Sequence, residues 1–522
     1  MAPQRDAIII GSGVNSLACA VHLAHRGWRV VVYEQAATPG GAVKCGAYTL
    51  PGLRHDWGAM NLSLFAGSPF FAEYGGALAG HGLEFAPVAK CFASVFDDGT
   101  WLGIGTDAQA NTARLNAENA DDAKAWQALA AAFPQEAEDI FAILGSPMQK
   151  RAFARIGWKL ARKRGLRGSA DFARFMTMSP RAWLDQTFTS DKVKALLGVW
   201  GMHLDFAPDI AGGAVFPYLE GMANQAFGMV LGKGGADTIV HAMVKLIEAK
   251  GGKVICDTPV THILTDEGRT LGVTLANGTD VHAGTVIANV APSALARMIG
   301  GSGHKSYDEG LTKFAHAPGT MMIHAALDGL PDWRAGTQLQ DFAYVHIAPS
   351  LDQMARTYQQ ARAGLLPDQP VIVVGQPTTI DPSRSTDGTH ALWIQVRMAP
   401  ATINGDAKGQ ITATDWAQAA DPFADRILDI IDTHAPGIRS KIKGQRIVTP
   451  PELEHDNPNL VGGDQVCGSH HLSQHFLNRP MPGYADGSTP INNLWHTGAA
   501  VWPGGGTGVG PGWMLAQKLA NK

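Results

Sequence analysis

The chain opens on the stretch DAIIIGSGVNS, which spans residues 6–16. A short run of aliphatic residues followed by spaced glycines is typical of a strand that turns into a helix at a nucleotide phosphate. Gly11 permits a sharp turn, and Gly13 lets the backbone approach a pyrophosphate. The helix predicted over residues 14–26 directs its positive N-terminus at that anion. The stretch therefore predicts a dinucleotide-binding βαβ unit.

The next predicted strand, VVVYE at residues 30–34, ends on an acid. Glu34 follows Gly13 by about 20 residues, where a carboxylate accepts hydrogen bonds from a ribose. An acid at this place disfavours the 2′-phosphate of NADP. Ser16 stands where the third glycine of the motif is usual, and serine is small enough to replace it. We expect cofactor contacts from Gly11, Gly13 and Glu34, joined by these neighbours: Val14, Asn15, Ser16 and Gln35.

Two further glycine turns favour FAD over NAD as the cofactor. TPGGA at residues 38–42 suits a loop that passes over the pyrophosphate of a long, extended FAD. HDWGA at residues 55–59 suits a close backbone approach to the flavin end. The cofactor contacts expected from these turns are Gly40, Gly41, Ala42, Asp56, Gly58 and Ala59.

Composition excludes several classes of protein. The 522 residues are 45% hydrophobic and 17% charged, with a net charge of −4, so nucleic acid is not an expected partner. The five cysteines have no metal-ligand or redox-pair spacing, and we expect reduced thiols and no metal site. No apolar run is long enough for a transmembrane helix. Because the nucleotide motif begins near the sixth residue, we expect no signal peptide and a cytoplasmic location.

The second half of the chain returns to the nucleotide sheet. We predict a helix over 236–249 and strands over 253–256, 260–264, 270–275 and 285–289, with Val260 and Asn289 at the cofactor. The last block is a strand, a glycine loop and a helix over 512–520, which again offers backbone N–H groups to an anionic edge of the flavin. Its expected cofactor contacts are Gly498, Ala499, Gly506, Thr507, Gly508 and Val509.

The predicted fold class is α/β: a discontinuous Rossmann-like FAD-binding domain with an inserted α+β substrate domain. The FAD-binding domain is expected to comprise residues 1–100, 233–299 and 481–522. The substrate domain is expected to comprise residues 101–232 and 300–480.

With these motifs the chain resembles the phytoene desaturase-like FAD-dependent oxidoreductases. Within that family it is most similar to the phytoene dehydrogenase-related branch, whose members contain a pyridine nucleotide-disulfide oxidoreductase domain. The matching motifs follow in family order: GVNSL at 13–17, GGA at 40–42, DPS at 381–383, TPPELE at 449–454 and PGGG at 503–506. The resemblance covers nearly the whole chain. Trp502 departs from it, because a histidine is common before the PGGG motif.

Substrate contacts are expected from two regions. His471, Gln474, Arg479 and Trp502 flank the terminal flavin loop, although His471 matches no family motif. Aromatic residues and methionines are frequent over 188–229, among them Trp200, Phe216 and Met222. That composition suits a cavity for a long lipid, and it equally suits ordinary core packing. No catalytic residue is assigned.

The segment 149–167 is rich in lysine and arginine, contains aromatic residues and lacks acids. A basic amphipathic helix of this kind can lie on an anionic membrane surface. It could also be a solvated surface helix or pack against a partner subunit. The resulting expectation is peripheral contact with the inner face of a membrane.

The resemblance implies a flavoenzyme that desaturates an apolar, isoprenoid, polyene or other lipid-like substrate by hydride transfer to flavin N5. No second dinucleotide motif is present, so oxygen or a quinone is the expected electron acceptor. Two alternatives remain open: a flavin-dependent isomerase without net redox, and a non-enzymatic flavoprotein that acts in assembly or regulation. The sequence leaves the oligomeric state undecided, and a homo-oligomer is one outcome.

Overall fold

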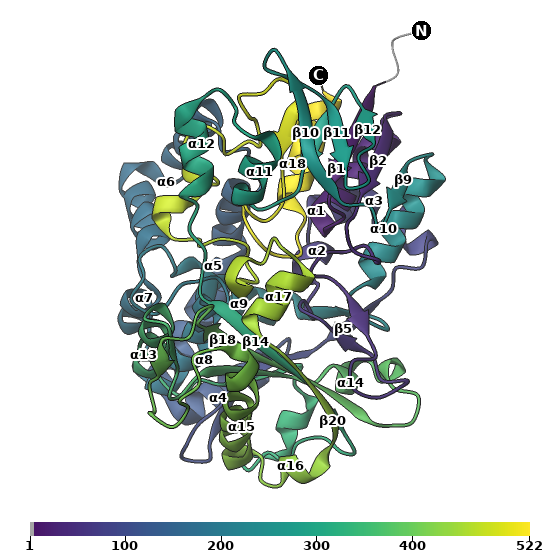
Figure 1. Ribbon diagram of the computed structural model, residues 1–522. Helices are drawn as coiled ribbons and strands as arrows, with labels where there is room; N and C mark the ends of the chain where they lie inside the picture. Colours follow the sequence, from purple (N-terminus) through teal and green to yellow (C-terminus); the bar gives the residue numbers. More distant parts are fainter. Residues whose placement is uncertain (1–4, 522) are drawn as a thin grey trace.

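A five-stranded parallel sheet brings both ends of the chain together with its middle (Figure 1). The computed structural model describes residues 5–521. The strand order is β21-β13-β1-β2-β9, and every pairing is parallel. The strands are β1 (Asp6–Ile10), β2 (Arg29–Tyr33), β9 (Lys253–Ile255), β13 (Val286–Ala288) and β21 (Leu494–His496). Their carboxyl ends share one edge, which is where an open α/β sheet binds its ligand.

Alternating residues of β1 face two different layers, because side chains alternate across a strand. Ala7 and Ile9 pack on a helical layer, whereas Ile8 and Ile10 pack on a small antiparallel sheet. The helical layer consists of α1 (Val14–His25), α3 (Pro69–Gly80), α10 (Thr238–Ala249) and α18 (Gly510–Ala520). The opposite layer consists of β10 (Val260–Asp266), β11 (Arg269–Leu275), β12 (Asp280–His282) and α11 (Pro292–Ile299). The predicted Rossmann-like α/β fold is confirmed.

A seven-stranded sheet forms the other half of the molecule, in the order β20-β14-β18-β17-β15-β6-β7. Its strands are β6 (Lys90–Val95), β7 (Trp101–Gly105), β14 (Gly319–Leu327), β15 (Tyr344–Ile347), β17 (Val371–Gly375), β18 (His390–Ala399) and β20 (Ile442–Val448). Neighbours are antiparallel except β15 and β6, which are parallel.

The two faces of this sheet have different coverings. On the outer face, aliphatic side chains pack on α15 (Trp416–His434). The inner face contributes to a core cluster shared with α5 (Ala120–Leu144), α8 (Asp191–Met202) and α9 (Val215–Phe227). That cluster also includes Trp57 and Met60, from the expected flavin end of the nucleotide domain. The inner face therefore connects the two halves of the molecule.

One predicted domain boundary needs correction. Residues 90–95 were placed in the FAD-binding domain, yet they form β6, whose Phe92 pairs with Tyr344 of β15 in the seven-stranded sheet. The pairing partner lies about 250 residues away, and local pattern cannot reveal a pairing over such a separation.

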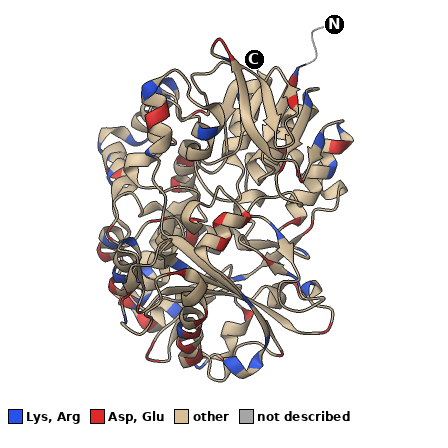
Figure 2. Ribbon diagram, in the orientation of Figure 1, with Lys and Arg blue, Asp and Glu red and all other residues tan. Residues whose placement is uncertain are grey.

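The basic segment lies within one long helix, α6 (Lys150–Thr177), which is interrupted at Gly165, where φ is 70°. Lys, Arg, Asp and Glu lie mainly on peripheral helices and loops (Figure 2). Within residues 5–521, no helix has both the length and the apolar character needed to cross a bilayer. The remaining helices are α2 (Ser63–Ala66), α4 (Ala108–Glu118), α7 (Pro180–Thr187), α12 (Lys305–Thr312), α13 (Leu351–Arg362), α14 (Pro377–Ile380), α16 (Ile438–Lys441) and α17 (Pro450–Asp456). The remaining strands are β3 (Cys45–Gly46), β4 (His55–Asp56), β5 (Phe85–Val88), β8 (Met229–Gly232), β16 (Leu365–Leu366) and β19 (Gly405–Asp406).

Candidate active site

Glu34 organises the first glycine turn. The backbone N–H and the hydroxyl of Ser12 both donate to Oε2 of Glu34 at 2.7 Å, and the N–H of Ala36 donates to Oε1 at 2.9 Å. A carboxylate has about four acceptor sites, so it retains capacity for a ribose hydroxyl. Gln35 beside it is exposed. The carboxylate of Glu34 is therefore fixed at the end of β2, and it can still accept a further hydrogen bond from a ribose hydroxyl.

The two glycine turns touch each other backbone to backbone. The N–H of Gly40 donates to the carbonyl of Ser12 at 3.2 Å and to its hydroxyl at 3.1 Å. A Cβ placed on Gly41 would lie 3.2 Å from the Cα of Gly13. Because Gly41 also has a φ of 62°, a side chain there would be strained as well as crowded. These turns form a side-chain-free cradle of the kind that a pyrophosphate occupies.

Two helix N-termini meet at this cradle. The first turn of α1 has no side-chain cap and no acid, so its N–H groups are available to an anion. The start of α18 also lacks a side-chain cap and follows Val509, whose φ is 53°. The N–H of Gly512 donates to Oδ1 of Asn15 at 3.3 Å. Both helix dipoles therefore favour negative charge in one place, and the residues present fit FAD.

The other predicted cofactor residues surround the same turns. The N–H of Thr258 donates to the carbonyl of Glu34 at 2.8 Å, which brings Val260, at the start of β10, near the ribose acid. Asn289 and Gly498 lie in contact, because a Cβ on Gly498 would fall 1.9 Å from Oδ1 of Asn289. The predicted residues Gly11, Gly13, Ser16, Asn289 and Gly498 are thus brought together.

The terminal glycine loop reaches the expected flavin end. Thr507 donates its hydroxyl proton to the carbonyl of Asn61 at 3.4 Å, and Cβ atoms on Gly506 and Gly508 would meet Leu64. A Cβ on Gly58 would lie 3.0 Å from the carbonyl of Ala42. Ala59 is half-buried in the same turn. Residues 42, 58–61 and 506–508 therefore converge from three parts of the chain.

The side chain of Asp56 anchors the turn whose backbone is predicted to approach the flavin end. Its Oδ2 accepts from Nη1 of Arg384 at 2.7 Å, and its Oδ1 accepts from the N–H of Ala236 at 2.7 Å and the thiol of Cys45 at 3.0 Å. The side chain thereby joins three chain segments, which leaves the backbone of this turn for the cofactor. Burial, followed by the charge of Asp56, raises the pKa of Cys45 well above its ordinary value, so this cysteine stays a thiol.

The residues predicted to contact substrate near the terminal loop mostly have protein partners. The side-chain amide of Gln474 donates to the carbonyls of Ala315 and Ser469 and accepts from the N–H of Ala315. Arg479 is fully buried and donates to the carbonyls of Ser469 at 2.8 Å and Ala499 at 2.7 Å. Burial lowers the pKa of Arg479 to about 10. Arg479 thereby fixes the loop around Ala499, and Gln474 fixes the segment at Ser469, which Arg479 also contacts.

Trp502 and His471 lie apart from each other in the core. Nε1 of Trp502 donates to the carbonyl of Ser146 at 2.9 Å, and its ring stacks on Phe476. Nε2 of His471 lies 2.8 Å from the carbonyl of Asp205. Trp502 therefore occupies the usual histidine position as a packing residue with a satisfied N–H.

The predicted residues of the 188–229 region do lie on the inner side. Trp200 and Met222 belong to the buried cluster that includes Trp57 and Met60, and Phe216 packs against that cluster. Phe216 also stacks on Phe206, with ring centroids 5.0 Å apart. These side chains can supply an apolar environment next to the flavin end.

Sequence reasoning missed the polar side chains of the inner face. β18 places Trp393, Gln395 and Arg397 on that face, and all are buried. β14 and β15 add His324 and His346, and burial lowers the pKa of each to about 3. The signal was present in β18, where polar or aromatic residues alternate with Leu392, Ile394 and Val396.

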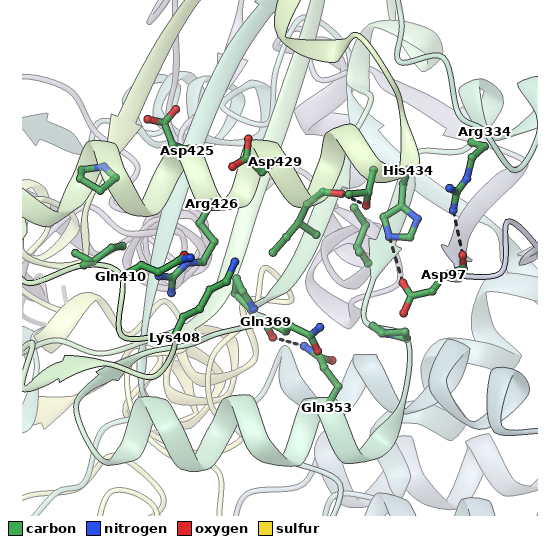
Figure 3. A pocket seen from close by; sticks show the side chains of 17 residues that line it. Asp97, Arg334, Gln353, Gln369, Lys408, Gln410, Asp425, Arg426, Asp429 and His434 are labelled. Carbon is green, nitrogen blue, oxygen red and sulfur yellow. Dashed lines mark hydrogen bonds and ion pairs between the residues drawn. The ribbon is translucent and has the colours of Figure 1, made fainter.

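A separate cavity of about 740 Å³ lies beside α15, near the outer face of the seven-stranded sheet (Figure 3). Its charged residues largely pair with protein groups. Arg334 donates to the carbonyl of Asp97 at 3.1 Å, and His434 lies 3.7 Å from the Asp97 carboxylate. Arg426 pairs with Asp406 at 2.7 Å. The cavity is on the opposite side of the sheet from the cofactor residues, so it is not the candidate active site.

Comparison with known proteins agrees with this geometry. The family model described as flavin-containing amine oxidoreductase matches residues 17–325. The chain is 25% identical to pyridine nucleotide-disulfide oxidoreductase domain-containing protein 2 of Mus musculus, over 97% of this chain and 91% of that protein. It is 26% identical to all-trans-zeta-carotene desaturase of Myxococcus xanthus, over 96% and 90% respectively. Cyclohexylamine oxidase from Brevibacterium oxydans has a similar fold, with a TM-score of 0.59 at 17% identity over 99% of each chain.

The Rossmann-like sheet, the paired glycine turns and the ribose acid define a FAD-dependent oxidoreductase. The chain belongs to the flavin-containing amine oxidoreductase family. The resemblance to its phytoene desaturase-like members is confirmed by the relatives that match nearly the full chain.

Proposed function

We propose that this protein desaturates a long, largely apolar substrate of isoprenoid, polyene or similar lipid character. When bound, FAD would supply the hydride acceptor for a C–H bond of that substrate. Relatives named as a phytoene desaturase and an all-trans-zeta-carotene desaturase support this substrate class. The chain itself must bind the cofactor, orient the substrate and exclude water.

The observation that carries the proposal is the continuity of the buried core. Trp57 and Met60, next to the Gly58 turn, share one apolar cluster with Trp200 and Met222 of α8 and α9. An apolar substrate that replaced part of this packing would lie between the flavin end and the inner face. Such an environment keeps water from the reacting carbons.

The roles of the cofactor residues follow from their geometry. The N-termini of α1 and α18 would favour the pyrophosphate of FAD, and Glu34 would accept a hydrogen bond from its ribose. Arg479 fixes the loop around Ala499, and Gln474 fixes Ser469, which Arg479 also contacts, so that the terminal glycine loop keeps its shape. No separate NAD(P) motif is present, so we propose oxygen or a quinone as the electron acceptor.

The test is an anaerobic mixture of the purified holoprotein with fractionated isoprenoid and lipid extracts, followed by the visible band of the flavin. Bleaching by one fraction, with a product two hydrogens lighter, is the expected result. Turnover only after prereduction of the flavin, with no change in mass, would instead indicate an isomerase. A band that no fraction changes, together with a stable protein partner, would indicate a non-enzymatic flavoprotein. Oxygen and a soluble quinone added afterwards would identify the acceptor by reoxidation rate.

We also propose that α6 holds the protein on an anionic membrane surface. Lys163 and Arg164 pair with Glu136, Glu138 and Asp139 of α5. Within the described chain, the other basic residues over 150–167 have no ion pair: Lys150, Arg151, Arg155, Lys159, Arg162 and Arg167. Trp158 is 61% exposed among them and Phe153 is 47% exposed. Basic and aromatic side chains on one exposed helix suit an anionic lipid interface.

Sedimentation with phosphatidylglycerol vesicles tests this surface. The wild-type protein is expected to bind, and a variant with Arg151, Arg155, Lys159 and Arg162 replaced by Gln is expected to bind at least about tenfold more weakly. The control replaces by Gln both Lys305, in α12, and Lys313, the residue directly after α12, which removes exposed charge elsewhere. Equal binding of all three proteins would contradict the membrane proposal.

A further inference from the structure

The inner face of the seven-stranded sheet carries polar side chains that have no evident purpose in packing. On β18, Leu392, Ile394 and Val396 point to the outer face and pack in an apolar cluster with α15. Trp393 and Arg397 point the other way and are 3% and 5% exposed. Burying a polar group is costly unless it is hydrogen-bonded, and burying a charge is costlier still. The polar groups on this face therefore need hydrogen-bond partners, and the charge of Arg397 needs a counter-charge.

The buried charge on this face is that of the Arg397 guanidinium. Its Nη2 donates to the carbonyls of Met202 at 3.1 Å and His203 at 2.5 Å, whereas its Nε has no partner. No carboxylate of residues 5–521 lies within ion-pair distance of Arg397. Desolvation lowers the pKa of Arg397 to about 10, so the side chain remains charged at neutral pH.

The nearest acids contact other groups. Asp464 accepts from the backbone N–H groups of Ala317 at 3.0 Å and Gly468 at 2.6 Å. Oδ1 of Asp205 accepts from the phenol of Tyr358 at 3.0 Å, and its Oδ2, which has no hydrogen-bond partner, lies 3.2 Å from Nε2 of His471. These carboxylates act on Arg397 only from a distance, which leaves its guanidinium without a direct counter-ion.

Three aromatic rings that pack together add unpartnered nitrogen atoms, and one of them belongs to His203, whose carbonyl accepts from Arg397. The ring centroid of Trp200 lies 4.8 Å from that of His203 and 5.3 Å from that of His346, and the two imidazoles are 5.6 Å apart. Nε1 of Trp200, Nε2 of His203 and both ring nitrogens of His346 have no hydrogen-bond partner. Burial lowers the pKa of both imidazoles, and Arg397 lowers that of His203 further, so each ring is neutral and can donate one hydrogen bond.

This group lies along the sheet from the expected flavin end. Trp57 stacks on His324 with centroids 5.7 Å apart, and His324 is paired with Trp393 across β14 and β18. Arg397 follows Trp393 by four residues on the same face, or about 13 Å at the usual rise per residue. A chain of that length could extend from the flavin end to the guanidinium.

We propose that Arg397, Trp200, His203 and His346, here called the inner polar cluster, bind the carboxylate end of the substrate. The inference rests on the proposed function and narrows its substrate class from a hydrocarbon to an amphipathic acid with an apolar chain. A guanidinium binds a carboxylate with two hydrogen bonds and supplies its counter-charge. Water could complete the hydrogen bonds of the cluster, but it would leave the buried charge without compensation.

A pair of matched probes tests the inference on the purified holoprotein. Farnesoic acid and farnesol share one isoprenoid chain and differ in the carboxylate. Their dissociation constants can be measured by quenching of tryptophan fluorescence. We expect the acid to bind at least about tenfold more tightly than the alcohol. Arg397→Gln should abolish this preference and leave the affinity for farnesol within about twofold.

A second variant and a control keep the test independent of folding defects. His346→Phe keeps an aromatic ring at this position and removes both ring nitrogens, and it should reduce the preference for the acid severalfold. Arg446→Gln removes a charge from the exposed strand β20 of the same sheet and should keep the preference intact. Thermal melting of each variant establishes that it is folded before binding is compared.

Two results would overturn the inference: equal affinity of the wild-type protein for acid and alcohol, or an acid preference that survives Arg397→Gln. Failure of the proposed function is a separate result, because binding is measured without turnover. Acid-selective binding with no flavin reduction by any substrate would contradict desaturation while upholding the binding site. Flavin reduction by a hydrocarbon, together with equal binding of acid and alcohol, would support desaturation and contradict the carboxylate-binding site.

Discussion

Asn289 donates a hydrogen bond from Nδ2 to the hydroxyl of Ser16 at 2.8 Å, across 273 positions of sequence. Ser16 occupies the place of the third glycine in the nucleotide motif, and the bond gives its side chain a partner on the loop after β13. The same amide closely approaches two glycines. Cβ atoms on Gly13 and Gly498 would lie 3.1 Å from Nδ2 and 1.9 Å from Oδ1. Asn289 therefore holds the first and last segments of the cofactor site together.

Gly498→Ala should disrupt this junction. The new Cβ would overlap Oδ1 of Asn289, and the φ of 101° at Gly498 is strained for any other residue. We expect a loss of more than about 2 kcal/mol in the free energy of unfolding and substoichiometric FAD. The control is Gly278→Ala, where φ is 82° and no atom lies within 4 Å. It should cost only about 1 kcal/mol and retain FAD, as measured by denaturation and flavin absorbance. Full FAD occupancy in the Gly498 variant would contradict the role of this junction.

Glu34→Gln should weaken FAD binding. A carboxamide places an N–H₂ group or a weaker acceptor opposite the donors of Ser12, and it is a poorer acceptor for ribose. The dissociation constant, measured by fluorescence titration of apoprotein with FAD, should rise at least about tenfold. Asp6→Asn is the matched control, because Asp6 lies at the opposite end of β1 and bonds to Gly284 and Arg29. An equal effect of both substitutions would mean that Glu34 acts only through folding.

Arg384→Met should destabilise the protein strongly. Arg384 and Asp56 form a fully buried ion pair at 2.7 Å, and Arg384 also donates to the carbonyl of Gly232 at 2.9 Å. Removing the cation leaves a buried carboxylate uncompensated, which costs about 3–5 kcal/mol. Arg29→Met breaks the more exposed pair with Asp6 and should cost at most about 1 kcal/mol. Urea denaturation monitored by circular dichroism compares the two. Similar urea midpoints for both variants would show that burial of an ion pair does not decide how much its loss lowers the free energy of unfolding.

Glu220 predicts a pH-dependent stability. Burial raises its pKa from 4.5 to about 7, and its carboxylate accepts a hydrogen bond from Nδ2 of Asn224 at 3.2 Å. Between pH 4.5 and about 7, Glu220 holds a proton in the folded protein that it has released in the unfolded chain. The free energy of unfolding therefore falls as pH rises through this range. Glu220→Gln stays neutral and should remove this fall. The variant should be more stable than wild type by about 1–3 kcal/mol above pH 7 and similar to it below about pH 4.

Urea denaturation across this pH range provides the measurement for Glu220. Glu248→Gln, at an exposed position of α10, controls for loss of a glutamate charge. A difference between wild type and Glu220→Gln that does not change with pH would contradict the assignment.

The predictable parts of the site were those with a local cause. The helix expected over 14–26 is Val14–His25, and the one expected over 236–249 is Thr238–Ala249. Their apolar spacing and terminal glycines are readable from adjacent residues. The partners of Asp56 were not predictable in this way. Arg384 lies 328 positions further along the chain, just after the DPS motif that the sequence identified without a reason. The motif has a structural role, since Asp381 accepts from the N–H of Gly234 at 2.6 Å.

The sequence by itself determined the cofactor turn, because a strand, spaced glycines, a helix and an acid act through the backbone of neighbouring residues. It also determined the membership of the family through motifs in fixed order. Only the tertiary structure decided which distant groups meet: Asn289 with Ser16, Asp56 with Arg384, and Arg397 with the carbonyl of His203. The reason is physical. Whether a buried polar group has a partner depends on packing between distant segments, and no local pattern encodes which partner will be absent.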